Sequence, residues 1–269
     1  MDKKSRVKDA WNKWSDTDFA KYRSDEKISK LIAHPESAFH HSTYSMIRDV
    51  FPNLQGKRIC IPSSGDNHAV FAFHLMGAAV TSVDISERQL ENGVAIANKH
   101  GWDIQFICDD TMELKQIKSD EYDFVYTSNG VHVWINDLNA MYRNIFRILK
   151  SNGAYIMYDV HPFTRPFGED TKQLTIKKPY DAIGPFGEIP TYTWRMQDII
   201  NAIVSSSLSI KHVEEMYAEY NTYWFEVSGE REKMSKEDVD KLYQWEHNPL
   251  AAIPQWLSIY AIKDFNHFI

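Results

Sequence analysis

The stretch ICIPSSGDNHAVFAFHLMGAAVTSVDIS, residues 59–86, decides the fold. It has the pattern of a short β-branched strand, a tight turn PSSGDN, an apolar helix and a second strand that ends in Asp84. A buried strand whose turn opens a helix places backbone N–H groups where they can meet an anionic or polar ligand group. The stretch therefore predicts part of an α/β protein with a ligand site at the turn.

The turn has one glycine, Gly65, where turns of this kind usually have three. Gly65 lets the backbone approach a ligand closely, and Ser63 and Ser64 keep the turn small while adding hydroxyl groups. Asn67 stands where a glycine is common, and we expect it to serve there because asparagine tolerates the left-handed conformation well. Asp84 follows the turn by about 20 residues, the spacing from which a carboxylate can accept hydrogen bonds from both hydroxyls of a ribose.

Short apolar runs alternate with helical runs along most of the chain. Strands are expected in RICIP (58–62), AVTSVDI (79–85), IQFICDD (104–110), YDFVYTSN (122–129), AYIMYDV (154–160, after a turn at 151–153), LSIKHVEEMYAEY (208–220) and WLSIYAIKD (256–264). The alternation of the first five with helices predicts parallel strands joined by crossover helices.

Three segments lie outside this alternation. Residues 1–50 contain charged and aromatic residues at helical spacing, which predicts an N-terminal helical cap before a core at 51–269. Residues 161–195 are rich in Pro, Gly and aromatic residues, which predicts an ordered lid. Residues 228–254 form a charged helical excursion that we expect on the surface.

Composition excludes several classes of protein. The chain has 269 residues, 43% of them hydrophobic, which suits one large domain or a domain with a lid. A net charge of −7 makes a nucleic-acid or membrane-surface partner improbable. The N-terminus lacks the apolar core of a secretion signal, and no stretch reaches the ~18 apolar residues of a membrane span, so we expect a cytoplasmic protein.

The two cysteines, Cys60 and Cys108, both lie in apolar runs and are expected to be buried in strands. A disulfide framework is therefore improbable. No HExxH motif, facial-triad spacing or Cys–His cluster occurs, so we expect no metal site.

Residues 57–160 resemble class I S-adenosylmethionine-dependent methyltransferases. PSSGDN corresponds to the glycine-rich first motif of that family, Asp84 to its ribose-binding acid and ICDDTMEL to its adenine-contacting segment. TSNGVHVWIND and LKSNGAYIMYDVHPF are similar to the motifs at its fourth and fifth strands. The resemblance implies an α/β fold with a Rossmann-like, mostly parallel sheet of seven strands, helices on both faces and an antiparallel last hairpin.

The resemblance also implies S-adenosylmethionine as cofactor. Ile85 would pack on the adenine and Asp110 would accept a hydrogen bond from its exocyclic amine, while the backbone at Thr111 or Met112 reads the ring. The chain around Ser63 and Asn129 would hold the amino-acid end. The cofactor-binding residues implied are Ser63, Ser64, Gly65, Asp84, Ile85, Asp110, Thr111, Met112 and Asn129. Ser63 and Asn67 replace two of the family's three glycines, and Ile61 replaces a common acid.

Candidate catalytic and substrate-binding residues follow the fourth and fifth strands. His132 and His161 lie where a substrate would face the methyl group, and each serves either as a general base or in capping and packing. Tyr22 and Arg23 either close over the cofactor or lie on a solvated helix face. A set of aromatic residues either lines a substrate pocket or packs the lid: Tyr217, Tyr220, Tyr223, Trp224 and Trp245.

The implied function is transfer of a methyl group to a small-molecule O, N, S or C acceptor by in-line displacement. Two alternatives stay open. An NAD-dependent Rossmann oxidoreductase is disfavoured because the turn lacks GxGxxG. A cofactor-binding protein without transfer activity is compatible with the altered first motif.

Overall fold

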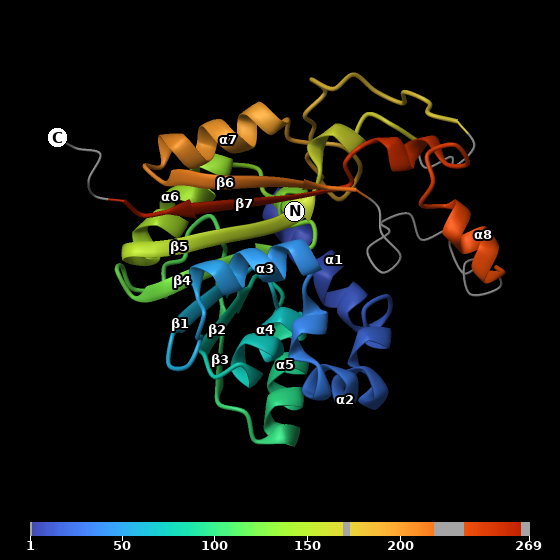
Figure 1. Cartoon of the computed structure of the whole chain (residues 1–269). Coiled ribbons are helices and arrows are strands. Elements are labelled where there is room, and N and C mark those ends of the chain that lie inside the picture. Colours follow the sequence, from blue (N-terminus) through green and yellow to red (C-terminus); the bar gives the residue numbers. More distant parts are fainter. Residues whose placement is uncertain (1, 169–172, 218–233, 265–269) are drawn as a thin grey trace.

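The computed structural model describes residues 2–168, 173–217 and 234–264. Within them, seven strands form one sheet in the order β3-β2-β1-β4-β5-β7-β6 (Figure 1). The strands are β1 Arg58–Pro62, β2 Ala79–Asp84, β3 Ile104–Cys108, β4 Tyr122–Ser128, β5 Leu149–Val160, β6 Ser209–Met216 and β7 Trp256–Ile262. Neighbours among β1 to β5 pair in parallel, and β7 is antiparallel to both β5 and β6. The predicted sheet and its antiparallel closing hairpin are confirmed.

Helices cover both faces of this sheet (Figure 1). The helices are α1 Lys3–Asp16, α2 Asp25–Ala33, α3 His41–Val50, α4 His68–Leu75, α5 Glu87–His100, α6 Leu138–Ile148, α7 Met196–Ser205 and α8 Lys236–Lys241, the last of which lies apart from the sheet (Figure 1). Because successive strand residues point to opposite faces, Tyr155 of β5 packs with α6 and α7, whereas Ile156 packs with α3 and α4. Each face of the sheet therefore packs against its helices through its own cluster of buried apolar side chains.

The strand order reverses beside β1, which pairs with β2 on one side and β4 on the other. After β1 the chain adds β2 and β3 on one side and then crosses back to add β4 on the other side of β1. The loops after β1 and β4 therefore run in opposite directions and leave a crevice between them. In open α/β sheets, ligands bind in the crevice at the carboxyl ends of the strands at such a point. This topology places the turn at 63–67 in that crevice.

Helix α1 lies against α5 and is tied to it by polar side chains. Arg88 Nε donates to Asp16 Oδ2 at 2.7 Å, and Ser86 Oγ donates to Asn12 Oδ1 at 2.7 Å. Lys8 forms an ion pair with Glu87. The predicted N-terminal helices are present, and these contacts hold the first of them near the carboxyl ends of the strands.

Two local expectations are wrong. Cys108 is exposed rather than buried, because β3 is the edge strand of the sheet; Cys60, in the inner strand β1, is buried as expected. The turn expected at residues 151–153 belongs to β5, where a register shift lets Asn152 adopt a φ of 61°. Its N–H donates to the carbonyl of Lys263 at 2.9 Å, so the residue that follows β7 helps to hold this irregularity in place.

The described part of the 161–195 segment contains the short 3-10 helix η4 (Pro162–Thr164) and two isolated bridges. Trp194 Nε1 donates to the Ile135 carbonyl at 2.9 Å, and the Tyr192 N–H donates to the Val133 carbonyl at 2.8 Å. The end of this segment is thus fixed to the loop after β4. Of the 228–254 excursion, residues up to 233 lie outside the described part, and the rest contains α8 and the 3-10 helix η6 (Pro249–Ala252).

The described residues contain neither a helix suited to crossing a membrane nor a metal-binding cluster. None of the helices there combines the length and apolar character that crossing a bilayer requires. No group of three or more His, Cys, Asp and Glu side chains in that part of the chain could hold a metal ion.

Candidate active site

Two adjoining cavities open at the carboxyl ends of β1, β2 and β4. The first has a volume of about 160 Å³ and is lined by the turn after β1, the ends of β2 and β3, the loop after β4 and one side of α1. The second has a volume of about 630 Å³ and lies between the N-terminal helices and the loop after β4. Their shared lining residues are Trp11, Phe19, Asp66, Asn67, Asn129, Gly130 and Trp134.

The turn after β1 owes its shape to two residues with positive φ, Ser63 at 52° and Gly65 at 49°. A Cβ on Gly65 would lie 2.6 Å from the Cβ of Gln89, so only glycine fits there. Asn67 does not have the expected left-handed conformation. Its φ is −58°, and its side chain caps α4 by accepting the Ala69 N–H at 2.9 Å. The missing glycine is therefore replaced by a helix cap.

Hydroxyl groups hold this turn against its neighbours. Ser63 Oγ lies 2.7 Å from Thr111 Oγ1, which connects the turn to the segment after β3. Ser64 is buried, and its Oγ lies 2.9 Å from Ser82 Oγ, which in turn donates to the Gly65 carbonyl at 2.7 Å. Ser63 thus fastens the turn to the segment after β3, and Ser64 fastens it to β2.

Asp84 is a buried acid, 6% exposed, on the wall of the first cavity. Its Oδ1 accepts the Ser86 N–H at 2.8 Å, and Ser86 rather than Asp84 caps α5. No cation among the described residues lies within ion-pair distance of it. Burial raises the pKa of Asp84 to about 7, and the charge of nearby Asp66 adds to that rise. An acid of this kind is a candidate ligand-binding group.

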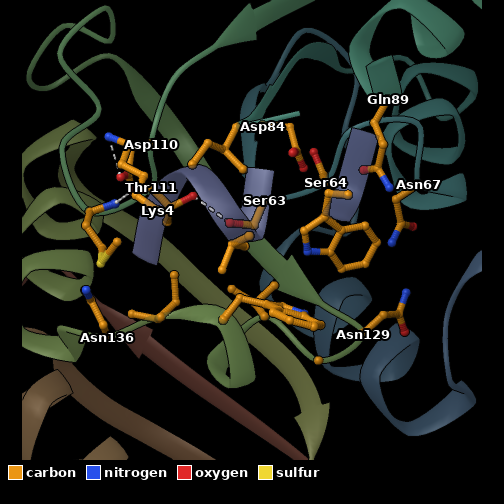
Figure 2. A pocket seen from close by; sticks show the side chains of 18 of the residues that line it. Lys4, Ser63, Ser64, Asn67, Asp84, Gln89, Asp110, Thr111, Asn129 and Asn136 are labelled. Atoms are coloured by element: carbon orange, nitrogen blue, oxygen red, sulfur yellow. Dashed lines mark hydrogen bonds and ion pairs between the residues drawn. The ribbon is translucent and has the colours of Figure 1, made fainter. Parts of the chain in front are cut away.

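Asp110 also lines the first cavity, and its two oxygens have different partners. Oδ1 accepts the Met112 N–H at 2.8 Å, while Oδ2 lies 2.7 Å from the ammonium nitrogen of Lys4 (Figure 2). The adjacent Asp109 uses both of its oxygens on backbone N–H groups, those of Asp110 and Gln116. Of the two neighbouring acids, Asp110 is the one that faces the cavity.

The structure brings together most of the residues that the family resemblance selects. Those that line the first cavity are Ser63, Ser64, Asp84, Ile85, Asp110, Thr111, Met112 and Asn129. Gly65 does not line it but shapes the turn. Asn129 has a φ of 65° and is followed by Gly130 at 87°, so the backbone turns sharply between the two cavities.

Neither candidate catalytic histidine reaches these cavities. His132 is buried with both ring nitrogens occupied, Nδ1 at 2.6 Å from Asp159 Oδ2 and Nε2 at 2.7 Å from Tyr142 Oη. Burial by itself would raise the pKa of Asp159, but the attraction and hydrogen bonds of His132 lower it more strongly, so this pKa lies below its usual value. His161 accepts the Phe163 N–H at 3.1 Å and contacts Glu215 at 2.8 Å. Both therefore occupy packing and capping positions, and the expectation that they face a substrate is not met.

The second cavity has aromatic walls, which come mostly from the N-terminal helices. Its aromatic lining residues are Trp11, Phe19, Tyr22 and Trp134. Trp11 packs against Phe19 and Trp134 with ring centroids 5.0 and 5.4 Å apart. The aromatic set expected from the C-terminal half is not here: Tyr217 and Trp245 are 54% and 63% exposed and line neither cavity. The other three members lie outside the described residues: Tyr220, Tyr223 and Trp224.

Sequence reasoning missed the contributions of α1 and of the segment after β5. Lys4 and Trp11 from α1, and Arg165 from that segment, line one or both cavities. Arg23 does not point at a ligand, because its Nη1 donates to Asp66 Oδ2 at 2.8 Å. The helical spacing of Trp11 indicates an amphipathic helix, but that pattern does not tell which surface the helix covers.

Comparison with known proteins connects these features. A family model described as "Methyltransferase domain" matches residues 63–153. An uncharacterized methyltransferase, YbaJ, of Bacillus subtilis (strain 168) is 26% identical over 131 residues, which is 49% of this chain and 51% of that protein. The chain thus spans about half the length of this curated relative.

Solved structures match over a greater length. An S-adenosylmethionine-dependent methyltransferase from Mesorhizobium loti superposes with a TM-score of 0.59 and 19% identity, covering 82% of this chain and 97% of that one. Magnesium protoporphyrin IX methyltransferase from Synechocystis PCC 6803, solved with bound SAH, gives a TM-score of 0.59 at 16% identity and covers 97% and 99%. These likenesses establish the fold. Together with the family model at residues 63–153, they show that the chain has the fold of S-adenosylmethionine-dependent methyltransferases and contains a region similar to a methyltransferase domain.

Proposed function

We propose that this chain transfers a methyl group from S-adenosylmethionine to a small molecule, with the cofactor in the first cavity and the acceptor in the second. The observation that carries the proposal is the buried carboxylate of Asp84, which has no cationic partner among the described residues and faces a cavity. Burying such a charge is costly unless it gains hydrogen bonds, and the two hydroxyls of a ribose would supply them.

The rest of the first cavity fits an adenosine group. Ile85 offers an apolar side chain next to Asp84, and Asp110 keeps one oxygen that no backbone N–H occupies. That oxygen, Oδ2, now accepts from the Lys4 ammonium, so it has the position and charge to accept from an exocyclic amine instead. Ser63 and Asn129 would hold the amino-acid end of the cofactor near the wall that the two cavities share.

The proposed activity depends on positioning. Bound cofactor supplies an already electrophilic methyl group, and displacement of this kind needs the acceptor atom in line with it. Trp11 and Trp134 line both cavities, and with cofactor and acceptor bound their rings would help to exclude water from the boundary between the two. Because His132 and His161 are engaged elsewhere, the structure favours an acceptor that needs no histidine base from these two positions.

Calorimetry with S-adenosylhomocysteine and, separately, with NAD tests the proposal. We expect S-adenosylhomocysteine to bind and NAD not to bind. NAD binding alone would favour the oxidoreductase alternative. A screen of small acceptors with methyl-labelled cofactor then separates a transferase from a protein that only binds the cofactor, because only the transferase would move the label.

Lys4→Met should tighten binding of S-adenosylhomocysteine by a few fold. The substitution removes the ammonium that occupies Asp110 Oδ2 but keeps a side chain of similar length. A partly exposed ion pair contributes about 0.2–1 kcal/mol. The ligand must break this pair to bind the unmodified protein but not Lys4→Met, so the variant should gain that much binding free energy. Calorimetry at low ionic strength measures it, since salt screens the pair.

Lys13→Met is the matched control for Lys4→Met, because Lys13 is an exposed lysine on the same helix. Its affinity for S-adenosylhomocysteine should equal that of the unmodified protein. Weaker binding by Lys4→Met would mean that Lys4 supports the ligand instead of competing with it.

A further inference from the structure

Arg165 stands out among the charged residues of the second cavity. It follows η4, where its backbone N–H donates to the Pro162 carbonyl at 3.2 Å, and its side chain lines the cavity. Within the described part of the chain, its guanidinium makes no side-chain hydrogen bond and no ion pair. Burial lowers the pKa of Arg165, which reflects the cost of holding this charge away from water. Five N–H donors thus lack a protein acceptor at the edge of a cavity.

The acids near Arg165 are already occupied. Asp159 influences Arg165 electrostatically, but its carboxylate accepts from His132 at 2.6 Å and from the Val160 N–H at 2.7 Å. Asp66 lines the same cavity and is paired with Arg23 at 2.8 Å. Asp159 attracts Arg165 through space, but neither acid forms an ion pair with it, so among the described residues the Arg165 guanidinium lines the second cavity without a carboxylate partner.

A second cation, Lys178, is close enough to Arg165 to be repelled by it. Burial lowers the pKa of Lys178, and repulsion from Arg165 lowers it further. Lys178 Nζ donates to Thr193 Oγ1 at 3.2 Å and lies 4.1 Å from the ring centroid of Phe186, so its own contacts are to neutral groups. An anion at Arg165 would relieve this repulsion, which favours a charged ligand over a neutral one.

Aromatic rings line part of the remaining cavity wall, beside polar residues such as Asp66, Asn67 and His68. Trp11, Phe19 and Trp134 line both cavities, so their aromatic rings form part of the wall of the cavity that Arg165 also lines. A volume of about 630 Å³ lies within the range usual for small-molecule pockets. A ligand held at one end by Arg165 would pack its body on these rings.

We propose that the second cavity takes a small organic acid, whose carboxylate binds Arg165 and whose apolar or aromatic body lies against Trp11, Phe19 and Trp134. This proposal names the class of acceptor and rests on the function proposed above. It makes Arg165 a specificity residue for the acceptor rather than a cofactor residue, because Arg165 lines the second cavity but not the first.

Paired probes that differ only in charge test this assignment. Phenylacetate is compared with phenylacetamide, and indole-3-acetate with indole-3-acetamide, by ligand-observed NMR titration of the full chain, with and without S-adenosylhomocysteine. Each acid should bind at least tenfold more tightly than its amide, as expected for a charge-assisted bidentate pair. Arg165→Gln should reduce the acid to the level of the amide, while Arg165→Lys should keep part of the preference because it retains the charge.

Lys177→Gln is the matched control, since Lys177 is an exposed lysine of the same segment and the substitution removes the same charge. It should leave the preference for acids unchanged, and Arg165→Gln should keep the affinity for S-adenosylhomocysteine measured by calorimetry. Equal binding of acid and amide, binding of neither at millimolar concentration, or a preference that survives Arg165→Gln would overturn the proposal. So would loss of S-adenosylhomocysteine affinity in Arg165→Gln, because Arg165 would then serve the cofactor.

The same experiment separates this proposal from the proposed function. If the acids bind through Arg165 but S-adenosylhomocysteine does not bind at all, the methyltransferase function fails and the anion site remains. If S-adenosylhomocysteine binds and the acids show no dependence on Arg165, the function remains and the acceptor class is wrong.

Discussion

Asp84→Asn is expected to abolish most of the stabilisation that S-adenosylhomocysteine confers, while raising the thermal stability of the cofactor-free protein at pH 8. The carboxylate of Asp84 is buried without a cationic partner among the described residues, and burial raises its pKa to about 7. Asparagine keeps one oxygen for the Ser86 N–H and removes the buried charge. It also removes an acceptor for ribose hydroxyls, which should weaken binding by about 1–3 kcal/mol.

The effect on stability should depend on pH in a defined direction. Since the pKa of Asp84 rises from 3.8 to about 7 on folding, the folded protein holds a proton that the unfolded chain releases between these values. Protonated Asp84 therefore contributes its full share to the free energy of unfolding below about pH 4, and this contribution is lost as the pH rises to about 7. The difference in melting temperature between Asp84→Asn and the unmodified protein should grow over that window and then level off.

Affinity for the cofactor should follow the opposite trend with pH. Ribose hydroxyls donate to the carboxylate form, so protonation of Asp84 competes with binding, and affinity should fall roughly tenfold for each pH unit below about 7. Differential scanning calorimetry measures the first trend and ligand titration the second. Both are run from about pH 5, which is about two units below the pKa of Asp84, to about pH 8. Asp49→Asn, at an exposed position on α3, is the control and should change neither. A pH-independent stability difference for Asp84→Asn would show that Asp84 does not titrate in this way.

Gly65→Ala should unfold or loosen the turn after β1 and eliminate cofactor binding. Its φ of 49° is unfavourable for alanine, and the new methyl group would lie 2.6 Å from the Cβ of Gln89 on α5. The left-handed conformation costs about 1–2 kcal/mol, and forcing an extra methyl group into a packed site adds about 1–3 kcal/mol. Because α5 would have to move away from the turn, Ser63 and Asp84 would lose their relative positions.

Gly56→Ala isolates the first of these two contributions. Gly56 has a φ of 72°, so alanine is strained there too, but a Cβ on it would meet nothing within 4 Å. Chemical denaturation should show a loss of stability for Gly56→Ala near the conformational cost alone, with cofactor binding retained. Equal losses in the two variants would mean that the contact with Gln89 is relieved without moving α5.

Much of the fold and of the adenosine end of the site could be predicted from local patterns. The alternation of β-branched and helical runs determines each strand, and a strand's end determines which residue reaches the crevice. Asp84 and Asp110 follow this rule, since each comes at or just after the end of a parallel strand, and all such ends lie on one edge of the sheet. Local patterns place Asp84 and the adjacent pair Asp109 and Asp110 at the strand ends, and the family resemblance selects Asp110 from that pair.

The sequence by itself therefore determined the order of elements, the sheet and the acids at its strand ends, because these depend on residues near each other in the chain. Tertiary structure alone decided the rest. Cys108 is exposed because β3 became the edge, His132 is occupied because Asp159 packs beside it, and Arg165 lines a cavity that α1 helps to close. Burial and partnership depend on which segments meet in space, and residues more than a hundred positions apart form the second cavity. A local pattern carries no record of such contacts.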